Sequence, residues 1–155
     1  YMCAAGLQSE NRGHAIQVCL AALEMMNYLK RANEQREKLR LKPWQMRIGV
    51  NSGPVMSGVV GEEKFTYDIW GDSVNVASLM ESHSEPGKIN LSESAYEQVK
   101  EIFEVEDRGK IDTGKKGSLP MFYLKSLKSE FSDDGGVKPN ESFQKKFGSL
   151  LKVYK

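Results

Sequence analysis

The chain lacks residues and segments on which several large classes of protein depend. Only two of its 155 residues are cysteines, Cys3 and Cys19, and they do not have the CxxC spacing typical of a zinc site. No apolar run approaches the roughly 18–20 residues that a membrane span needs. Residues 1–6 lack the basic and then apolar pattern of a signal peptide. Lysine and arginine total 22 against 21 for aspartate and glutamate, so the net charge is only +1, whereas nucleic-acid-binding domains are usually strongly basic.

The remaining composition is that of one globular domain. Hydrophobic residues make up 39% and charged residues 28% of the chain, which is ordinary for a globular protein. The length is sufficient for one domain with a hydrophobic core. Cys19 recurs at helical spacing with apolar residues, so we expect it to pack as a small hydrophobic side chain rather than to form a disulfide.

Hydrophobic periodicity divides the chain into helices and strands. We expect helices over residues 9–40, over 72–82 and from Ser92 or Ser94 to about residue 100, while residues 140–154 fit a short amphipathic helix. We expect strands over residues 46–51, 64–69, 88–91, 103–106, 110–112 and 121–125, with a loop or short hairpin over 52–63. This mixture indicates an α+β fold with helices packed on a mainly antiparallel sheet. Residues 1–127 are then the domain, and residues 128–155 a linker, flexible at 132–136, followed by the short helix.

The segment Phe65-Thr-Tyr-Asp-Ile-Trp-Gly-Asp-Ser-Val-Asn-Val-Ala-Ser-Leu-Met-Glu-Ser82 carries the most specific signal in the chain. The carboxylate of Asp68 can accept a hydrogen bond from the exocyclic amine of adenine. Its structural alternative is a turn aspartate that precedes Gly71. Asn75 offers a neutral amide that can position a ribose hydroxyl, or it ties a helix to a loop. Asn75 and Leu79 are four residues apart and therefore share one helix face.

This segment resembles the nucleotide-binding signature of the class III nucleotidyl cyclases, F-x-Y-D-x-W-G-x-x-V-N-x-A-S-R-M-E-S. These enzymes make cyclic AMP or cyclic GMP. The resemblance implies a ferredoxin-like cyclase fold, with Asp68 selecting adenine and Asn75 orienting the nucleotide sugar as a catalytic residue. Leu79 stands where the family has an arginine, which stabilises the charge that develops on the phosphates. Leucine supplies no such charge, although fixed cations carry much of the catalysis in phosphoryl chemistry.

Two further segments resemble the same family. Residues 47–61 fit R-I-G-x-x-x-G-x-V-x-x-G-x-x-G, and their glycines look structural because Val59 and Val60 replace the Lys-Ser/Thr of a P-loop. The segment from Arg108 to Leu124 is similar to the closing motif R-G-x-x-x-V-K-G-K-G-x-x-x-x-Y-x-V, whose first lysine contacts the triphosphate.

An alignment of the closing motif without gaps places Gly114 at that first lysine. Lys116 then matches the second lysine, and Lys115 stands one residue late. Lys115 and Lys116 are therefore the candidate phosphate-binding residues. The structural alternative is a solvated basic hairpin, in which neither lysine meets a phosphate.

The resemblance also implies a metal cofactor and a partner chain. The family holds two divalent ions, Mg²⁺ or Mn²⁺, with two aspartates, and we expect both to lie upstream of Tyr1. No carboxylate pair in the chain fits that role, so we predict no metal site within it. We expect the chain to be the C-terminal two-thirds of a cyclase domain, with little or no activity alone. The family builds its sites between two cyclase domains, so the expected partner is a second one, as a homodimer or heterodimer.

The leading interpretation is an adenylyl cyclase domain, a phosphorus-oxygen lyase that converts ATP to cyclic AMP and pyrophosphate in intracellular signalling. The first alternative is a pseudo-cyclase that binds nucleotide or dimerises without catalysis, which Leu79 and Gly114 favour. The second is a protein-interaction domain without nucleotide affinity. We expect a cytoplasmic location, compatible with a membrane-tethered parent, and no contact of this chain with nucleic acid or membrane.

Overall fold

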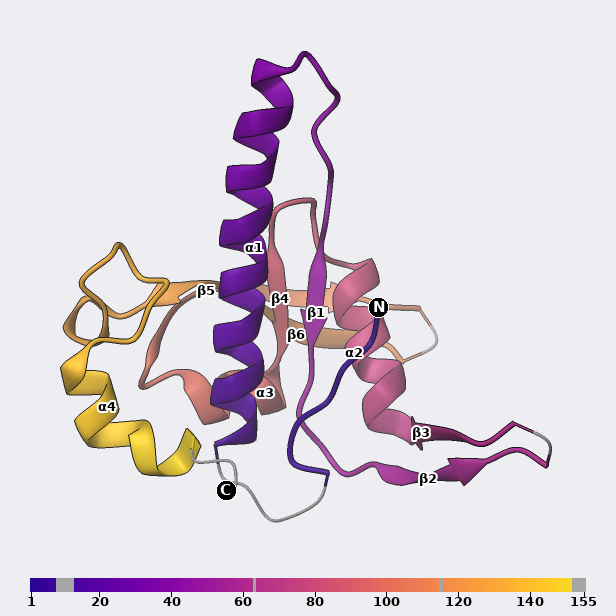
Figure 1. Cartoon of the computed structure of the whole chain (residues 1–155). Helices are drawn as coiled ribbons and strands as arrows, with labels where there is room; N and C mark the ends of the chain where they lie inside the picture. Colours follow the sequence, from indigo (N-terminus) through magenta and orange to yellow (C-terminus); the bar gives the residue numbers. More distant parts are fainter. Residues whose placement is uncertain (8–12, 63, 115, 152–155) are drawn as a thin grey trace.

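A computed structural model describes residues 1–7, 13–62, 64–114 and 116–151 of the chain (Figure 1). The helices are α1 (His14–Lys38), α2 (Asp72–Ser82), α3 (Glu93–Val99) and α4 (Glu141–Phe147), with 3-10 turns η1 (Ser129–Phe131) and η2 (Gly148–Leu151). The strands are β1 (Ile48–Val50), β2 (Met56–Val60), β3 (Thr66–Trp70), β4 (Ile89–Ser92), β5 (Phe103–Asp112) and β6 (Ser118–Leu127). Within these residues, no helix has the length and apolarity that crossing a membrane requires.

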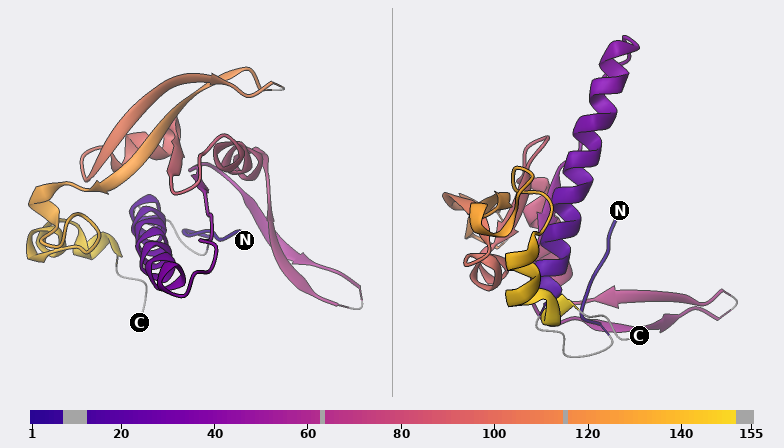
Figure 2. Two further views of the ribbon diagram at one scale, coloured as in Figure 1. Left: turned by 90° about the horizontal axis from the view of Figure 1, so that it is seen from above. Right: turned by 60° about the vertical axis from the view of Figure 1, so that its left-hand side comes forward.

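Four of the strands form one sheet in the order β1-β4-β6-β5. β1 runs parallel to β4, and the other two pairings are antiparallel, with Leu91 of β4 opposite Phe122 of β6. The strands β2 and β3 form a separate antiparallel hairpin that extends away from the body of the molecule (Figure 2). The predicted α+β class with a mainly antiparallel sheet is confirmed.

The main hydrophobic core lies between the sheet and the helices α1 and α3. Ile16, Cys19 and Leu23 recur at helical spacing on α1 and are buried there against Leu91 of the sheet and Val99 of α3. Burial raises the pKa of the Cys19 thiol to about 12. Cys19 therefore stays a neutral thiol at physiological pH and packs as the small hydrophobic side chain that the sequence predicts.

Helix α2 covers the opposite face of the sheet. Successive strand residues point to opposite faces. Val50 and Leu91 belong to the core beneath α1, whereas Asn90 reaches α2 by donating a hydrogen bond from Nδ2 to the carbonyl of Met80 at 2.8 Å. A Cβ atom on Gly49 would lie 2.1 Å from the Glu81 nitrogen, so the helix backbone rests directly on this glycine.

Strand β5 is one long strand rather than the two short strands expected over 103–106 and 110–112. Its pairing with β6 shifts between Asp107 and Lys110, where Gly109 adopts a positive φ of 72°. A β-bulge accounts for this shift, because it inserts unpaired residues without ending the strand. The alternation of apolar residues is broken at the bulge, which is why the sequence suggested two strands.

The C-terminal segment packs back onto the domain. Phe131, Phe143 and Phe147 form a cluster of ring contacts with centroid separations between 5.3 and 6.3 Å, and Phe143 is fully buried. The stretch expected to be flexible contains Asp134, whose Oδ1 accepts hydrogen bonds from the backbone nitrogens of Val137 and Lys138. The bond from Lys138, together with bonds from the Ser132 hydroxyl and from Val137, holds the pKa of the Asp134 carboxyl below its usual value. The domain boundary after residue 127 stays a prediction.

Candidate functional site

The first turn of helix α2 is anchored by a polar cluster around Asn51. The Nδ2 of Asn51 donates to the carbonyl of Ser73 at 3.0 Å, and its Oδ1 accepts from the hydroxyls of Ser92 at 2.6 Å and Ser94 at 3.0 Å. Ser92 is also the N-cap of α3 and accepts from the backbone nitrogen of Ala95. One amide side chain thus ties together the end of β1 and the starts of α2 and α3.

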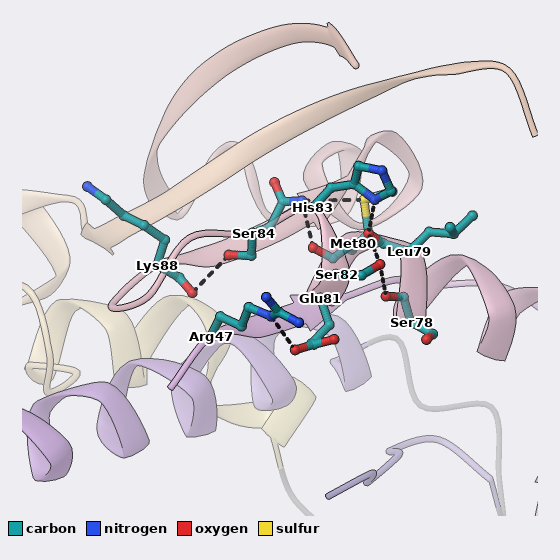
Figure 3. A network of polar contacts seen from close by, with 10 residues as sticks. Arg47, Ser78, Leu79, Met80, Glu81, Ser82, His83, Ser84 and Lys88 are labelled. Carbon is teal, nitrogen blue, oxygen red and sulfur yellow. Dashed lines mark hydrogen bonds and ion pairs between the residues drawn. The ribbon is translucent and has the colours of Figure 1, made fainter. Parts of the chain in front are cut away.

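The last turn of α2 is anchored by two cations, Arg47 directly before β1 (Figure 3) and Arg108 on β5. Arg47 pairs with Glu81, and the distance between Nε of Arg47 and Oε1 of Glu81 is 2.6 Å. Arg108 of β5 donates from Nη1 to the carbonyl of His83 at 2.8 Å and to Oδ1 of Asn90 at 3.0 Å. Cations near a helix C-terminus are favourable, because they face the last unpaired carbonyls.

His83 is the C-cap residue at this same end of α2. The sequence shows no partner for it, but its Nδ1 lies 2.9 Å from the carbonyl oxygen of Leu79. Asn75 is exposed and Leu79 is half-buried between the two anchored ends. Asn75, the predicted ribose-binding residue, is therefore exposed to solvent on a helix whose two ends are both held in place by hydrogen bonds.

Asp68 lies on strand β3, four residues before α2 begins. It stands opposite Gly58 in the hairpin register and is half-buried. Its Oδ1 accepts a hydrogen bond from the backbone nitrogen of Ile69 at 2.8 Å. The second carboxylate oxygen has no contact of this kind with the described residues, which suits the predicted role of an acceptor for a base amine.

Lys116 is drawn to the first turn of α2, where its Nζ forms an ion pair with Oδ1 of Asp72. The pairing joins the β5–β6 turn to a helix that lies 44 residues earlier in the chain. Asp72 and Asn75 are three residues apart on α2, so they share a helix face. Of the predicted site residues, Lys116 and Asn75 are thus brought to one helix, a proximity that spacing in the sequence could not reveal. Lys115 lies outside the described residues.

Gly114 occupies a tight turn with a positive φ of 70°. Its nitrogen donates to Oδ1 of Asp112 at 2.9 Å, and its carbonyl accepts from Gly117 at 3.0 Å. Side-chain-bearing residues rarely adopt this left-handed conformation. A lysine at this position would strain the turn, which gives a local physical reason for the glycine.

Two cavities adjoin α2. One of about 460 Å³ is bordered by Asp72 and Lys116, and the other, of about 380 Å³, is bordered by Ser73. Neither is lined by Asp68 or Asn75. The described residues also contain no group of three or more His, Cys, Asp or Glu side chains that could hold a metal ion. Asp68 and Asn75 therefore lie outside both of these cavities.

Residues 1–126 match the sequence model of the adenylate and guanylate cyclase catalytic domain. The chain belongs to this family. The matched range includes all three motifs discussed above, together with the hairpin, helix α2 and the β5–β6 turn. The family generally uses divalent metal ions.

Relatives within the family include both kinds of cyclase. An adenylate cyclase of Mycobacterium tuberculosis (strain ATCC 25618 / H37Rv) is 36% identical over 141 residues, covering 91% of this chain and 31% of that protein. The guanylate cyclase soluble subunit beta-2 of Rattus norvegicus is 38% identical over 125 residues, covering 80% of this chain and 18% of that protein. The chain thus spans less than a third of the length of these curated relatives.

A solved structure shares the architecture. The guanylate cyclase domain of RhGC from Catenaria anguillulae, determined in complex with GTP, has a TM-score of 0.71 and 29% identity, covering 81% of this chain and 66% of that one. The cyclase fold recognised from the three motifs is thereby confirmed. The individual roles of Asp68, Asn75, Lys115 and Lys116 stay predictions.

Proposed function

We propose that this chain supplies the nucleotide-binding part of an adenylyl cyclase domain, which converts ATP to cyclic AMP and pyrophosphate. The observation that carries the proposal is the placement of the family signature. Asp68 lies in the second strand of the hairpin, Asn75 is exposed on the helix that follows, and Lys116 is held beside the first turn of that helix. An acceptor for a base, an amide for a sugar and a cation for phosphate are the groups that ATP requires.

In the proposed reaction, the ribose 3′ oxygen attacks the α-phosphorus and forms a new P–O bond. The bond between the α-phosphorus and the oxygen that bridges to the β-phosphorus breaks, pyrophosphate leaves with the electron pair, and the proton of the 3′ hydroxyl passes to solvent. Asp68 accepts a hydrogen bond from the adenine amine, Asn75 orients the ribose, and Lys116 offsets phosphate charge. Divalent ions, when bound, would supply further charge neutralisation at the phosphates, although the described residues contain no group of three or more His, Cys, Asp or Glu side chains that could hold one.

The partner in this proposal is a second cyclase domain, and the β2–β3 hairpin is the surface that would receive it. Met56, Val59, Phe65 and Tyr67 are all more than half exposed on this projecting hairpin. Apolar side chains gathered on an extended arm favour association with another chain. The two free thiols, Cys3 and Cys19, fit the cytoplasmic location that the sequence predicts.

The alternative is a pseudo-cyclase that binds nucleotide without turnover. Leu79 places a half-buried aliphatic side chain where the family signature has arginine. Gly114 closes a turn at the place of the first family lysine, and Lys116 is already paired with Asp72. All three observations reduce the positive charge available to a triphosphate, and such charge carries much of phosphoryl-transfer catalysis.

Calorimetric titration of the chain with ATP and with GTP tests the shared part of both proposals. We expect Asp68→Ala to weaken ATP binding by about tenfold or more, the cost of one hydrogen bond to a charged acceptor, and to affect GTP less. The matched control is Glu104→Ala, which removes an exposed carboxylate of strand β5. Absence of any nucleotide binding would favour the protein-interaction reading.

Turnover separates the cyclase from the pseudo-cyclase. Cyclic AMP formation is measured with Mg-ATP and Mn-ATP in the longest natural form of the protein, with and without Leu79→Arg. Turnover by the unmodified protein supports the cyclase. Turnover that requires Leu79→Arg, with a gain on the order of 10³ as for other catalytic arginines, marks a cyclase that lacks one residue. No turnover in either form contradicts catalysis.

A further inference from the structure

Helix α1 projects far beyond the sheet (Figure 1). Its C-terminal end lies away from the β2–β3 hairpin and from helix α2. We call residues 36–44, where the helix ends and the chain turns back, the helix tip. In Figure 1 the tip stands at the top of the molecule, with the hairpin and α4 near the opposite end. The second view of Figure 2 also shows nothing of the described chain beyond it. A flat surface can therefore approach the tip without meeting the other described residues of this chain.

The turn at the tip is a Schellman motif with an unusual residue at its centre. The Leu41 nitrogen donates to the Arg36 carbonyl at 2.9 Å, and the Arg40 nitrogen donates to the Glu37 carbonyl at 2.9 Å. Arg40 has a φ of 57°, in the left-handed region where glycine is the usual residue. It is the only described residue other than glycine with a positive φ. A cation occupies this position although glycine would be less strained.

The tip is held rigidly by side chains of the helix. Asn33 makes two hydrogen bonds to the backbone of Trp44, one donated from Nδ2 at 2.9 Å and one accepted by Oδ1 at 2.8 Å. Arg36 donates from Nε to the Lys42 carbonyl at 2.8 Å, and its guanidinium lies 4.3 Å from the centre of the Trp44 ring. The exposed groups of the tip are thus presented in one preformed arrangement.

These groups combine apolar and basic character. Leu39 is 70% exposed, Leu41 49% and Trp44 56%. A Schellman motif usually buries the residue at Leu41's position against the side chain three residues before the cap. Here that side chain is Arg36, which turns to Trp44 instead. Three cations alternate with the apolar residues, namely Lys38, Arg40 and Lys42, and Glu37 is the one acidic residue of the tip.

We propose that the helix tip docks on the surface of an anionic phospholipid bilayer. Leu39 and Leu41 would enter the boundary between headgroups and acyl chains, Trp44 would lie at the headgroup level, and the three cations would meet lipid phosphates. The charge is concentrated at the tip while the whole chain carries only +1. A nucleic acid would match the cations but leave the two exposed leucines without a role, so the lipid surface fits better.

This proposal departs from the expectation of no membrane contact, which considered only segments long enough to span. It is independent of nucleotide binding and of catalysis. Anionic lipids attract each basic residue near the surface, which raises the affinity by roughly fivefold per residue. The combined effect of three cations is large enough to measure.

The experiment is co-sedimentation of the chain with vesicles of phosphatidylcholine, with and without roughly 30% phosphatidylserine. We expect binding to the anionic vesicles only, weakened when salt shortens the screening length. The double substitution Leu39→Ser/Leu41→Ser and the double substitution Lys38→Gln/Lys42→Gln should each lower the affinity at least tenfold. The matched control is Lys64→Gln/Lys110→Gln, which removes two exposed lysines elsewhere and should lower it far less.

Arg40→Gly separates binding from folding. Glycine relieves the left-handed strain, so this variant should unfold at a higher urea concentration while it binds anionic vesicles several-fold more weakly. Equal binding to neutral vesicles, or wild-type binding by the tip variants, would overturn the proposal. So would loss of binding in Val59→Ser/Phe65→Ser alone, because the hairpin would then be the contact. Binding to RNA or to acidic peptides in place of vesicles would overturn it too.

Discussion

Lys116 is a predicted phosphate-binding residue whose availability depends on a single neighbouring carboxylate. Asp72 of helix α2 forms an ion pair with Lys116 of the β5–β6 turn, and the Asp72 side chain is 72% exposed. Any triphosphate that binds at Lys116 must compete with this carboxylate for the ammonium group. The pairing is exposed, so it is weak enough to be broken by a ligand of higher charge.

Asp72→Asn should therefore raise the affinity for ATP. We expect an increase of about two- to fivefold, because an exposed ion pair is typically worth up to about 1 kcal/mol. Calorimetric titration measures the change, and Glu106→Gln, which removes the exposed partner of Lys125, is the control. An unchanged or reduced affinity would mean that Lys116 does not contact the nucleotide.

Arg108 acts on the opposite end of the same helix. Its guanidinium donates hydrogen bonds to the carbonyl of His83 and to Oδ1 of Asn90, and it lies 4.1 Å from the centre of the Tyr123 ring. In the sequence, Arg108 is the first residue of the segment that resembles the closing motif, and spacing alone gives no partner for its side chain. The structure gives it a role in holding α2 on the sheet.

Replacement of Arg108 should destabilise the fold. Arg108→Ala leaves two acceptors without their charged donor, so we expect a loss of about 2–3 kcal/mol in the free energy of unfolding. Arg108→Lys keeps the charge but not the planar fork, and its loss should be intermediate. Urea denaturation measures both, with Lys110→Ala as the exposed neighbouring control. A loss below about 0.5 kcal/mol in Arg108→Ala, typical of surface sites, would contradict this role.

At the scale of elements, the distance between α2 and the sheet depends on a glycine. The α2 backbone lies so close to strand β1 that a Cβ on Gly49 would be 2.1 Å from the Glu81 nitrogen and 2.5 Å from the Ala77 carbonyl oxygen. Backbone atoms cannot move aside as the end of a side chain can. The helix that carries Asn75 would have to shift as a unit.

Gly49→Ala should thus cost at least about 2 kcal/mol of stability, as overpacking in a core does. The control is Gly58→Ala in strand β2, where the nearest atom to a new Cβ is Cζ3 of Trp70 at 3.6 Å, an ordinary contact. Thermal or urea unfolding of the two variants decides the matter. Equal effects of both substitutions would show that the helix can move away at little cost.

At the scale of the whole molecule, the β2–β3 hairpin is the largest departure from a rounded shape (Figure 2). Its large apolar side chains Met56, Val59, Phe65 and Tyr67 are exposed, and helix α2 packs against strand β3. Two-stranded hairpins are marginally stable by themselves in water. Burial against a second chain would supply the missing apolar contact.

We expect the chain to self-associate through this hairpin. Sedimentation velocity over a wide range of concentration should show dimers or larger species, and Val59→Ser/Phe65→Ser should shift the protein toward the monomer. Tyr28→Ser, which removes an aromatic side chain 66% exposed on α1, is the matched control and should have little effect. A monomer at all concentrations would contradict the proposed interface.

The local elements of this protein follow from its sequence. Periodicity predicted α2 at 72–82, where the structure has Asp72–Ser82, and it predicted the long helix whose described part is α1. Spacing along one chain is enough for such predictions, because helical and extended periods are local properties. The cyclase family also follows from sequence, since its signature is contiguous in residues 65–82.

Contacts between distant residues were decided only by the tertiary structure. The pairing of Lys116 with Asp72 and the anchoring of α2 by Arg108 depend on how the β5–β6 turn and strand β5 are placed against a helix far away in the chain. The exposure of Leu39 and Leu41 likewise depends on how far α1 extends past the sheet. The sequence determines the chemical type of each residue and its spacing from others along the chain. The partner of a charged group and the burial of a side chain depend on how distant segments pack together.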